Sequence, residues 1–144
     1  MNKKSILAIE KIISYITELK IITKGKDANY FYDGFEMPIL CSLVDKIDEN
    51  INKINSKIKS KYNDIDWNII DSKKHDDNGI KTLKLGEIWS LSSGLLENEM
   101  LDKLNKILEN ELPIYYMNYC NNQHKKAIRE RNRRKNEEWL YLFK

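Results

Sequence analysis

The chain has 144 residues, enough for one domain with a sizeable hydrophobic core. Its 41% hydrophobic and 33% charged residues are typical of a globular protein, and five Gly and two Pro are few for an all-β chain. The net charge of +3 is too small to predict general affinity for nucleic acid, so only a local cluster of cations can provide it.

No apolar run approaches the roughly 20 residues that span a bilayer, and the start of the chain leads directly into a charged helical pattern. We therefore expect a cytoplasmic protein without membrane association. Cys41 and Cys120 lie in apolar contexts without metal-ligand spacing, which predicts two reduced and largely buried thiols.

Isoleucines at helical spacing begin the chain. Ile6, Ile9, Ile13 and Ile16 recur at steps of three and four, which predicts an amphipathic helix over residues 3–22. Gly25 suits the left-handed position that follows a helix, so we expect the helix to end just before it.

A second pattern alternates steps of four and three over nearly three heptads. It predicts one long helix over residues 36–61, in which Pro38 is tolerated in the first turn. The narrow seam suits one antiparallel partner, which the first helix supplies, although the same seam would also suit a homodimer. The residues of the seam are Leu40, Val44, Ile47, Ile51, Ile54 and Ile58.

The second half of the chain predicts shorter elements. Residues 62–67 read as a turn into a short helical segment over 67–71, and residues 72–79 have no apolar side chain and read as a solvated loop. A helix over 83–91 should place Leu85, Ile88 and Trp89 inward and end at the Ser-Ser-Gly of 92–94. Another helix should follow from about residue 97, and Pro113 should kink or end it.

These elements predict an all-α protein, an antiparallel helical bundle. We expect a single domain over residues 1–144, with the bundle in 1–112. Residues 113–144 form a basic and aromatic helical extension that is able to project from the bundle.

Four short motifs resemble those of the HepT-like HEPN family, the toxin halves of bacterial HepT–MntA toxin–antitoxin pairs. They are Ile-Glu-Lys-Ile at 9–12, Thr-Lys-Gly at 23–25, Ile-Asp-Glu at 47–49 and Tyr-Asn-Asp-Ile-Asp-Trp at 62–67. Their order and the interval between Glu49 and Trp67 match the family. The resemblance covers about residues 6–70 and implies a HEPN-like bundle.

The ribonuclease motif of that family is absent where the resemblance would place it. The family carries RNxxxH shortly after the tryptophan, where Arg and His of two protomers bind the scissile phosphate and assist attack by the RNA 2′-hydroxyl. This chain has Lys-Lys-His-Asp-Asp at 73–77. Neighbours on a helix point about 100° apart, so an adjacent Lys and His cannot replace an Arg and a His held about one turn apart.

Two other alignments of the motif also fail. If the loop is an insertion, the aligned stretch is 87–93, which contains neither Arg nor His. The closest literal string begins at Arg131 and has Asn136 in place of the histidine. Without that histidine the motif lacks a group with a pKa near 7 for general acid–base catalysis, so we expect no catalytic residues.

The two histidines offer no other recognisable chemistry. His75 lies beside Asp76 and Asp77 in the polar loop, where it would be a base or metal ligand or, more simply, a solvated side chain. His124 reads as a surface residue. No phosphate-binding glycine loop, Ser–His–Asp order or metal-ligand spacing is present, so we expect no metal and no cofactor.

The strongest binding signal is a run of seven cations within eleven residues. On a helix we expect it to give a positive stripe with aromatic groups at both ends, suited to phosphates and bases or to an acidic protein surface. The alternative is a solvated helix whose charges are partly offset by neighbouring Glu residues. The candidate binding residues are Lys125, Lys126, Arg129, Arg131, Arg133, Arg134, Lys135, Tyr116, Tyr119 and Trp139.

The leading hypothesis is a non-catalytic, HEPN-like interaction protein in conflict between bacteria and phages, such as a phage-encoded, anti-CRISPR-like inhibitor. Its partner would be a nuclease or a ribonucleoprotein, bound through the basic C-terminal segment. One alternative is a divergent HepT-like RNase toxin that uses His75 or Arg131 in a different centre. Another is a small helical subunit of a nucleic-acid-guided complex. Both the partner and homodimer formation stay open at this point.

Overall fold

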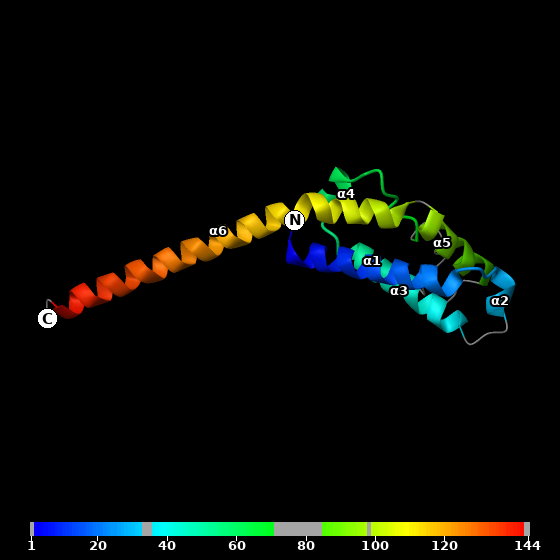
Figure 1. Ribbon diagram of the computed structural model, residues 1–144, viewed down its shortest axis with the longest axis horizontal. Coiled ribbons are helices and arrows are strands. Elements are labelled where there is room, and N and C mark those ends of the chain that lie inside the picture. Colours follow the sequence, from blue (N-terminus) through cyan, green and yellow to red (C-terminus); the bar gives the residue numbers. More distant parts are fainter. Residues whose placement is uncertain (1, 33–35, 71–84, 98, 143–144) are drawn as a thin grey trace. The chain divides into compact units, whose positions relative to one another are not determined.

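The computed structural model describes residues 2–32, 36–70, 85–97 and 99–142. The predicted all-helical class is confirmed, since the described residues form six helices and no strand (Figure 1). The chain divides into two compact units, Met1–Glu109 and Asn110–Lys144. We call the first the bundle unit, and we call the helical residues 110–142 of the second the distal helix. None of the described helices is long and apolar enough to cross a membrane.

Helix α1 (Lys3–Thr23) begins and ends as its sequence predicts. The Asn2 side chain caps it, because Asn2 Oδ1 accepts a hydrogen bond of 2.8 Å from the Ser5 backbone N–H. Ile6, Ile9 and Ile16 of the predicted face are buried in the core, whereas Ile13 is only partly buried against it. Ile9 and Ile12 are fully inaccessible to solvent. Gly25 adopts φ +70°, the left-handed conformation expected after the helix.

A short helix that the sequence pattern did not indicate, α2 (Ala28–Tyr32), follows. Asp27 caps it through Oδ1, which accepts a hydrogen bond from the Tyr30 backbone N–H at 3.2 Å. The Phe31 ring is fully buried and lies 5.3 Å from the ring of Trp89, centroid to centroid. This contact places α2 against α5 and closes one end of the core.

The prediction of one long helix over residues 36–61 is wrong, since two helices occupy this range. Helix α3 (Met37–Asn52) ends in a turn, and α4 (Ser56–Lys61) begins after it. Asn55 causes the restart, because its Oδ1 accepts a hydrogen bond of 2.7 Å from the Lys57 backbone N–H. Its own backbone N–H donates to the hydroxyl of Ser5 at the start of α1, at 3.0 Å.

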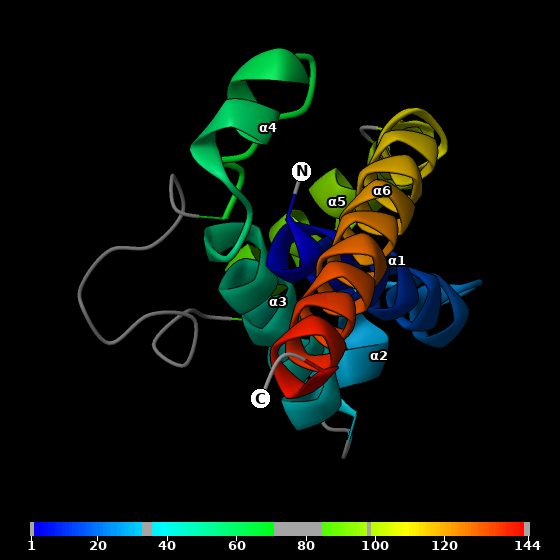
Figure 2. The same ribbon diagram turned by 90° about the vertical axis from the view of Figure 1, so that its left-hand side faces the viewer.

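The heptad seam nevertheless identifies the core correctly. All six of its residues are buried, including Ile54 at the break and Ile58 in α4. The predicted antiparallel partner is also confirmed: α1 and α3 lie side by side and run in opposite directions (Figures 1 and 2). The helix breaks where Asn55 can cap, and the turn keeps the apolar side chains on the same side of the bundle.

Trp67 explains why the 62–67 motif forms a turn. Its indole Nε1–H lies 3.2 Å from the Lys59 carbonyl and 3.1 Å from the Tyr62 carbonyl, so it satisfies acceptors at the end of α4. Residues 67–70 form turns, and the predicted helical segment there is wrong within the part that the structure describes. Residues 72–79, predicted to be a loop, lie outside the described residues.

Helix α5 (Leu85–Glu97) continues through residues 92–94, where the sequence analysis predicted a break. Ser92 is buried, and its hydroxyl donates a hydrogen bond of 2.8 Å to the Ile88 carbonyl one turn earlier. Leu91 and Leu95 carry the buried face across this point. The chain turns instead at Glu99, which has φ 51°, and α6 (Met100–Leu142) begins directly after it.

Pro113 was expected to kink or to end its helix. It lies inside α6, so the helix does not end there. Proline cannot donate a hydrogen bond to the carbonyl four residues earlier, here that of Glu109. Glu109 is exposed, so water can satisfy this carbonyl and the helix can continue. The boundary between the two compact units falls at the same residue.

Candidate polyanion-binding interface

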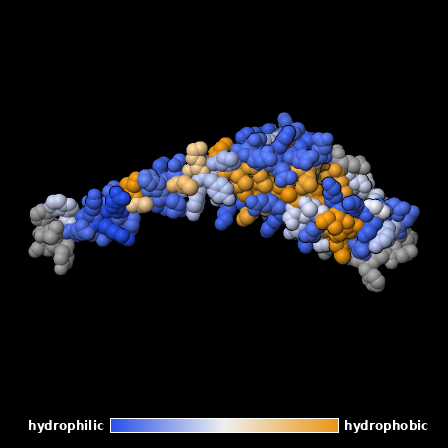
Figure 3. Space-filling model, viewed as in Figure 1, coloured by the Kyte–Doolittle hydropathy of each residue, from blue (hydrophilic) through white to orange (hydrophobic). Residues whose placement is uncertain are grey.

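All seven cations of the predicted binding segment lie on the distal helix, and all their side chains are exposed. They occupy residues 125–135, with Glu130 the one acid among them, so the segment carries a charge of +6. The whole chain carries +3, and the remaining residues therefore sum to −3. In Figure 3 hydrophilic side chains cover most of this part of α6. The net positive charge of the protein therefore comes from this segment.

The cations do not form the single stripe that the sequence analysis expected. Successive residues of an α-helix are turned by about 100°, which sorts the cations into two groups, each about 100° wide and centred on opposite sides of the axis. The first cationic face consists of Lys125, Lys126, Arg129 and Arg133, and the second cationic face consists of Arg131, Arg134 and Lys135.

Glu130 is paired with both faces. One carboxylate oxygen accepts a hydrogen bond from Arg133 and lies 3.6 Å from Nε of Arg134. The hydrogen bond with Glu130 raises the pKa of the Arg133 guanidinium, a group that is charged at physiological pH in any case. Because these side chains are exposed, the pairs add little stability, and an incoming phosphate can displace the carboxylate.

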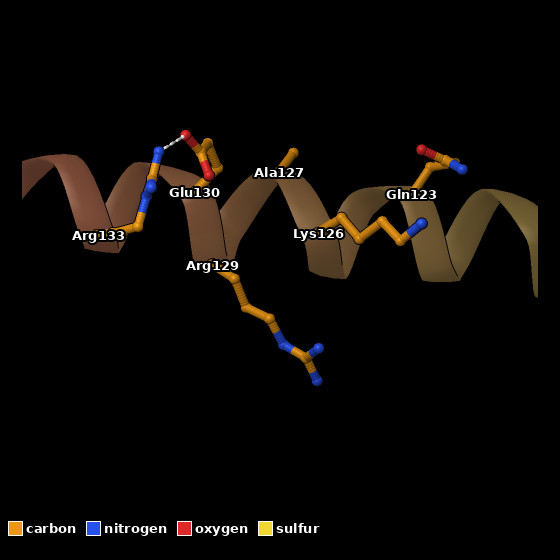
Figure 4. Close-up of a pocket in the computed structure, with 6 residues that line it drawn as sticks. All are labelled: Gln123, Lys126, Ala127, Arg129, Glu130 and Arg133. Carbon is orange, nitrogen blue, oxygen red and sulfur yellow. Dashed lines mark hydrogen bonds and ion pairs between the residues drawn. The ribbon is translucent and has the colours of Figure 1, made fainter.

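Figure 4 shows one side of this segment in detail. A shallow surface hollow is lined by residues of α6 alone, from Gln123 to Arg133. The Arg129 side chain extends away from the helix, whereas Arg133 turns back toward Glu130. A hollow formed by one helix cannot enclose a small molecule, so we read this surface as a place for contact with a larger partner.

The aromatic candidates lie on the same helix and are also exposed. Tyr116, Tyr119 and Trp139 are each between 53% and 60% accessible. The ring of Tyr115 lies 5.7 Å from that of Tyr116, centroid to centroid, in an edge-to-face arrangement. Tyr119 precedes the first cation by six residues, about 9 Å along the axis, and Trp139 follows the last by four. The structure places them at either end of the basic run.

The residues considered for catalysis do not assemble into a site within the described part of the chain. His75 lies outside the described residues. His124 is exposed on the distal helix. In the stretch aligned with the ribonuclease motif, Ile88 is buried in the core and the Ser92 hydroxyl is bonded to the backbone. No group of three or more His, Cys, Asp or Glu side chains in the described ranges is placed to hold a metal ion.

A second hollow, which the sequence analysis missed, lies in the bundle unit. The apolar side chains of Leu95 and Leu101 line it, together with the cations Lys20 and Lys24 and the acids Glu99 and Asp102. The two cations and the two acids offset each other, so the charge of the hollow favours neither anionic nor cationic ligands. No sequence signal marks this hollow, because it forms where the end of α1 meets the turn between α5 and α6.

Comparisons with protein families, with characterised proteins and with solved structures find no match to this chain. Function is therefore inferred from the residues and their arrangement.

Proposed function

We propose that the protein is a non-catalytic binding protein that contacts a polyanionic partner through the cations of its distal helix. The observation that carries the proposal is the placement of seven exposed cations on eleven residues of one helix. Phosphate groups neutralised by Lys and Arg release bound counterions, so such a cluster has affinity for nucleic acid and for nucleoproteins. The remaining residues carry a net charge of −3, so taken as a whole they do not attract a polyanion.

The motifs shared with HepT-like HEPN proteins suggest the setting. By that resemblance the chain would keep the helical scaffold of a toxin–antitoxin family and lack its ribonuclease motif. We propose that it acts in conflict between bacteria and phages, as an inhibitor that occupies a nuclease or a ribonucleoprotein. The distal helix would then compete for a nucleic-acid-binding surface or hold the nucleic acid itself.

A pull-down from host cells tests this proposal. The tagged full-length protein is compared with the variant R131E/R133E/R134E, and bound protein, RNA and DNA are all identified. A matched control, K3E/K11E/K106E, changes the net charge equally at exposed positions of the bundle unit. We expect a nucleic acid or a nucleoprotein that the wild type and the control retain and that the distal-helix variant loses.

Two results would contradict the proposal. One is equal retention of the partner by the wild type and the distal-helix variant, which would place the binding site elsewhere. The other is cleavage of RNA by the purified protein that His75→Ala abolishes, which would support the divergent toxin instead.

A further inference from the structure

The two cationic faces of the distal helix are separated by two edges of different chemistry. Helical geometry places the first edge at about 120–160° on a scale that sets Tyr116 to zero. We call it the amide–apolar edge, because it consists of Asn121, Ile128, Asn132 and Trp139. The opposite edge carries Glu130 and Glu137, and we call it the acidic edge. A third acid, Glu138, falls within the second cationic face, just beyond the last cation of the run.

We propose that the distal helix binds double-stranded DNA in the major groove, with its amide–apolar edge toward the base pairs. This inference rests on the proposed function, since both use the same cations, and it names the polyanion. The major groove of B-DNA is about 12 Å wide and admits an α-helix, whose diameter is about 10–12 Å. A helix in that position has a phosphate backbone on each side, and the two cationic faces supply a row of cations for each.

In this orientation each edge of the helix faces surroundings that suit its side chains. The acidic edge points out of the groove, where Glu130 and Glu137 are solvated and kept away from the phosphates. On the opposite side, the Asn121 and Asn132 carboxamides can each form two hydrogen bonds with adenine, and Ile128 can contact a thymine methyl group. All three of these side chains are exposed.

The length of this edge matches one passage along the groove. Asn121 and Asn132 are eleven residues apart in the sequence, which corresponds to about 16 Å along the helix axis. Base pairs of B-DNA are about 3.4 Å apart, so the edge spans about five of them. We therefore expect a preference for short sites that contain A·T pairs.

Other polyanions can contact only part of this arrangement of cations. An acidic protein surface or a single strand contacts a helix from one side and leaves the opposite cationic face without a counterpart. Double-stranded RNA has a major groove too deep and narrow for side chains to read. Cations on both sides of one helix are therefore best matched by duplex DNA.

Binding of the full-length protein to labelled probes tests the inference. The probes are a mixed-sequence DNA duplex of about two helical turns, one of its single strands, the corresponding RNA duplex and polyglutamate. Fluorescence anisotropy is measured over a range of salt concentrations. We expect the DNA duplex to bind most tightly and its affinity to fall steeply with salt.

Paired variants separate the two faces. K125E/R129E alters the first cationic face and R131E/K135E alters the second, and K4E/K11E on α1 is the control with an equal change in charge. We expect each distal pair to weaken binding by about tenfold or more and to reduce the salt slope by about two, while the control has little effect. Asn132→Ala should reduce the preference for A·T-containing duplexes and leave the salt slope unchanged.

The inference is overturned if only one face contributes, or if single-stranded DNA, duplex RNA or polyglutamate binds as tightly as duplex DNA. The inference fails, and the proposed function does not, if R131E/R133E/R134E still loses the cellular partner while the wild-type protein does not bind duplex DNA. The partner is then a different polyanion. The inference fails together with the proposed function if that variant retains the partner. Far-UV circular dichroism of each variant confirms that helix content is unchanged.

Discussion

At the scale of single residues, the two cysteines have different surroundings. Both were predicted to be largely buried, and this is wrong for Cys120, which is exposed on the distal helix. Cys41 is half-buried in α3, and burial raises the pKa of its thiol. The sequence context misleads because apolar neighbours along a helix do not guarantee a neighbour in space.

We expect the two thiols to react in two phases with a disulfide reagent such as dithionitrobenzoate. The thiolate is the nucleophile, so a raised pKa leaves Cys41 with less thiolate at about pH 8 and makes it the slow thiol. Its rate should rise about tenfold per pH unit and continue to rise beyond the ordinary thiol pKa. Cys120→Ser should remove the fast phase. Equal rates, or loss of the slow phase in that variant, would show the assignment to be wrong.

At the scale of the helices, one hydrogen bond joins the start of α1 to the start of α4. The Ser5 hydroxyl is fully buried and accepts the Asn55 backbone N–H at 3.0 Å. Asn55 also caps α4, so this contact fixes the position at which the heptad seam breaks and resumes. A buried N–H without a partner would cost free energy at the same point.

Ser5→Ala should lower the free energy of unfolding by about 1–3 kcal/mol, because it leaves the Asn55 N–H without its acceptor. Urea denaturation followed by circular dichroism measures the change. Ser14→Ala is the control, since Ser14 lies on the exposed face of the same helix. If both variants lose the same amount, the hydrogen bond contributes nothing beyond the intrinsic difference between Ser and Ala in a helix.

At the scale of the whole molecule, apolar burial is confined to the bundle unit. Every buried apolar side chain that the structure describes lies between Ile6 and Ile107. The distal helix has no such side chain among its described residues, and from Tyr116 to Trp139 nearly all its side chains are exposed, so local interactions must stabilise that part of it. Pro113 removes one helical hydrogen bond close to the boundary between the two units.

Heating should therefore unfold the protein in two steps. Circular dichroism at 222 nm should show a gradual loss of helix from the distal helix, followed by the cooperative transition of the bundle unit. Pro113→Ala restores a hydrogen-bond donor and removes the steric clash of the ring, which together are worth about 3 kcal/mol. It should raise the temperature of the first step without changing that of the second. A single cooperative transition in both proteins would mean that the distal helix is stabilised by more than local interactions.

The sequence by itself determined the helical class, the span of α1, the left-handed glycine after it and the six core positions of the heptad seam. Periodic apolar residues specify these features because burial of one face is the main force that holds a helix in a bundle. The run of cations was also apparent from the sequence, because a cluster of Lys and Arg can be recognised from composition alone. Its proposed role in binding remains a prediction.

Only the tertiary structure decided where the helices stop. Asn55 breaks the second heptad helix because the Ser5 hydroxyl is present to bind its backbone N–H. The Ser-Ser-Gly at 92–94 stays helical because Leu91 and Leu95 are buried on either side of it. The arrangement of the cations on two faces, in contrast, follows from helix geometry alone once the segment after Pro113 is helical, as it is in α6. The capping at Asn55 and the burial around residues 92–94 depend on atoms brought together from distant parts of the chain, which no local pattern contains.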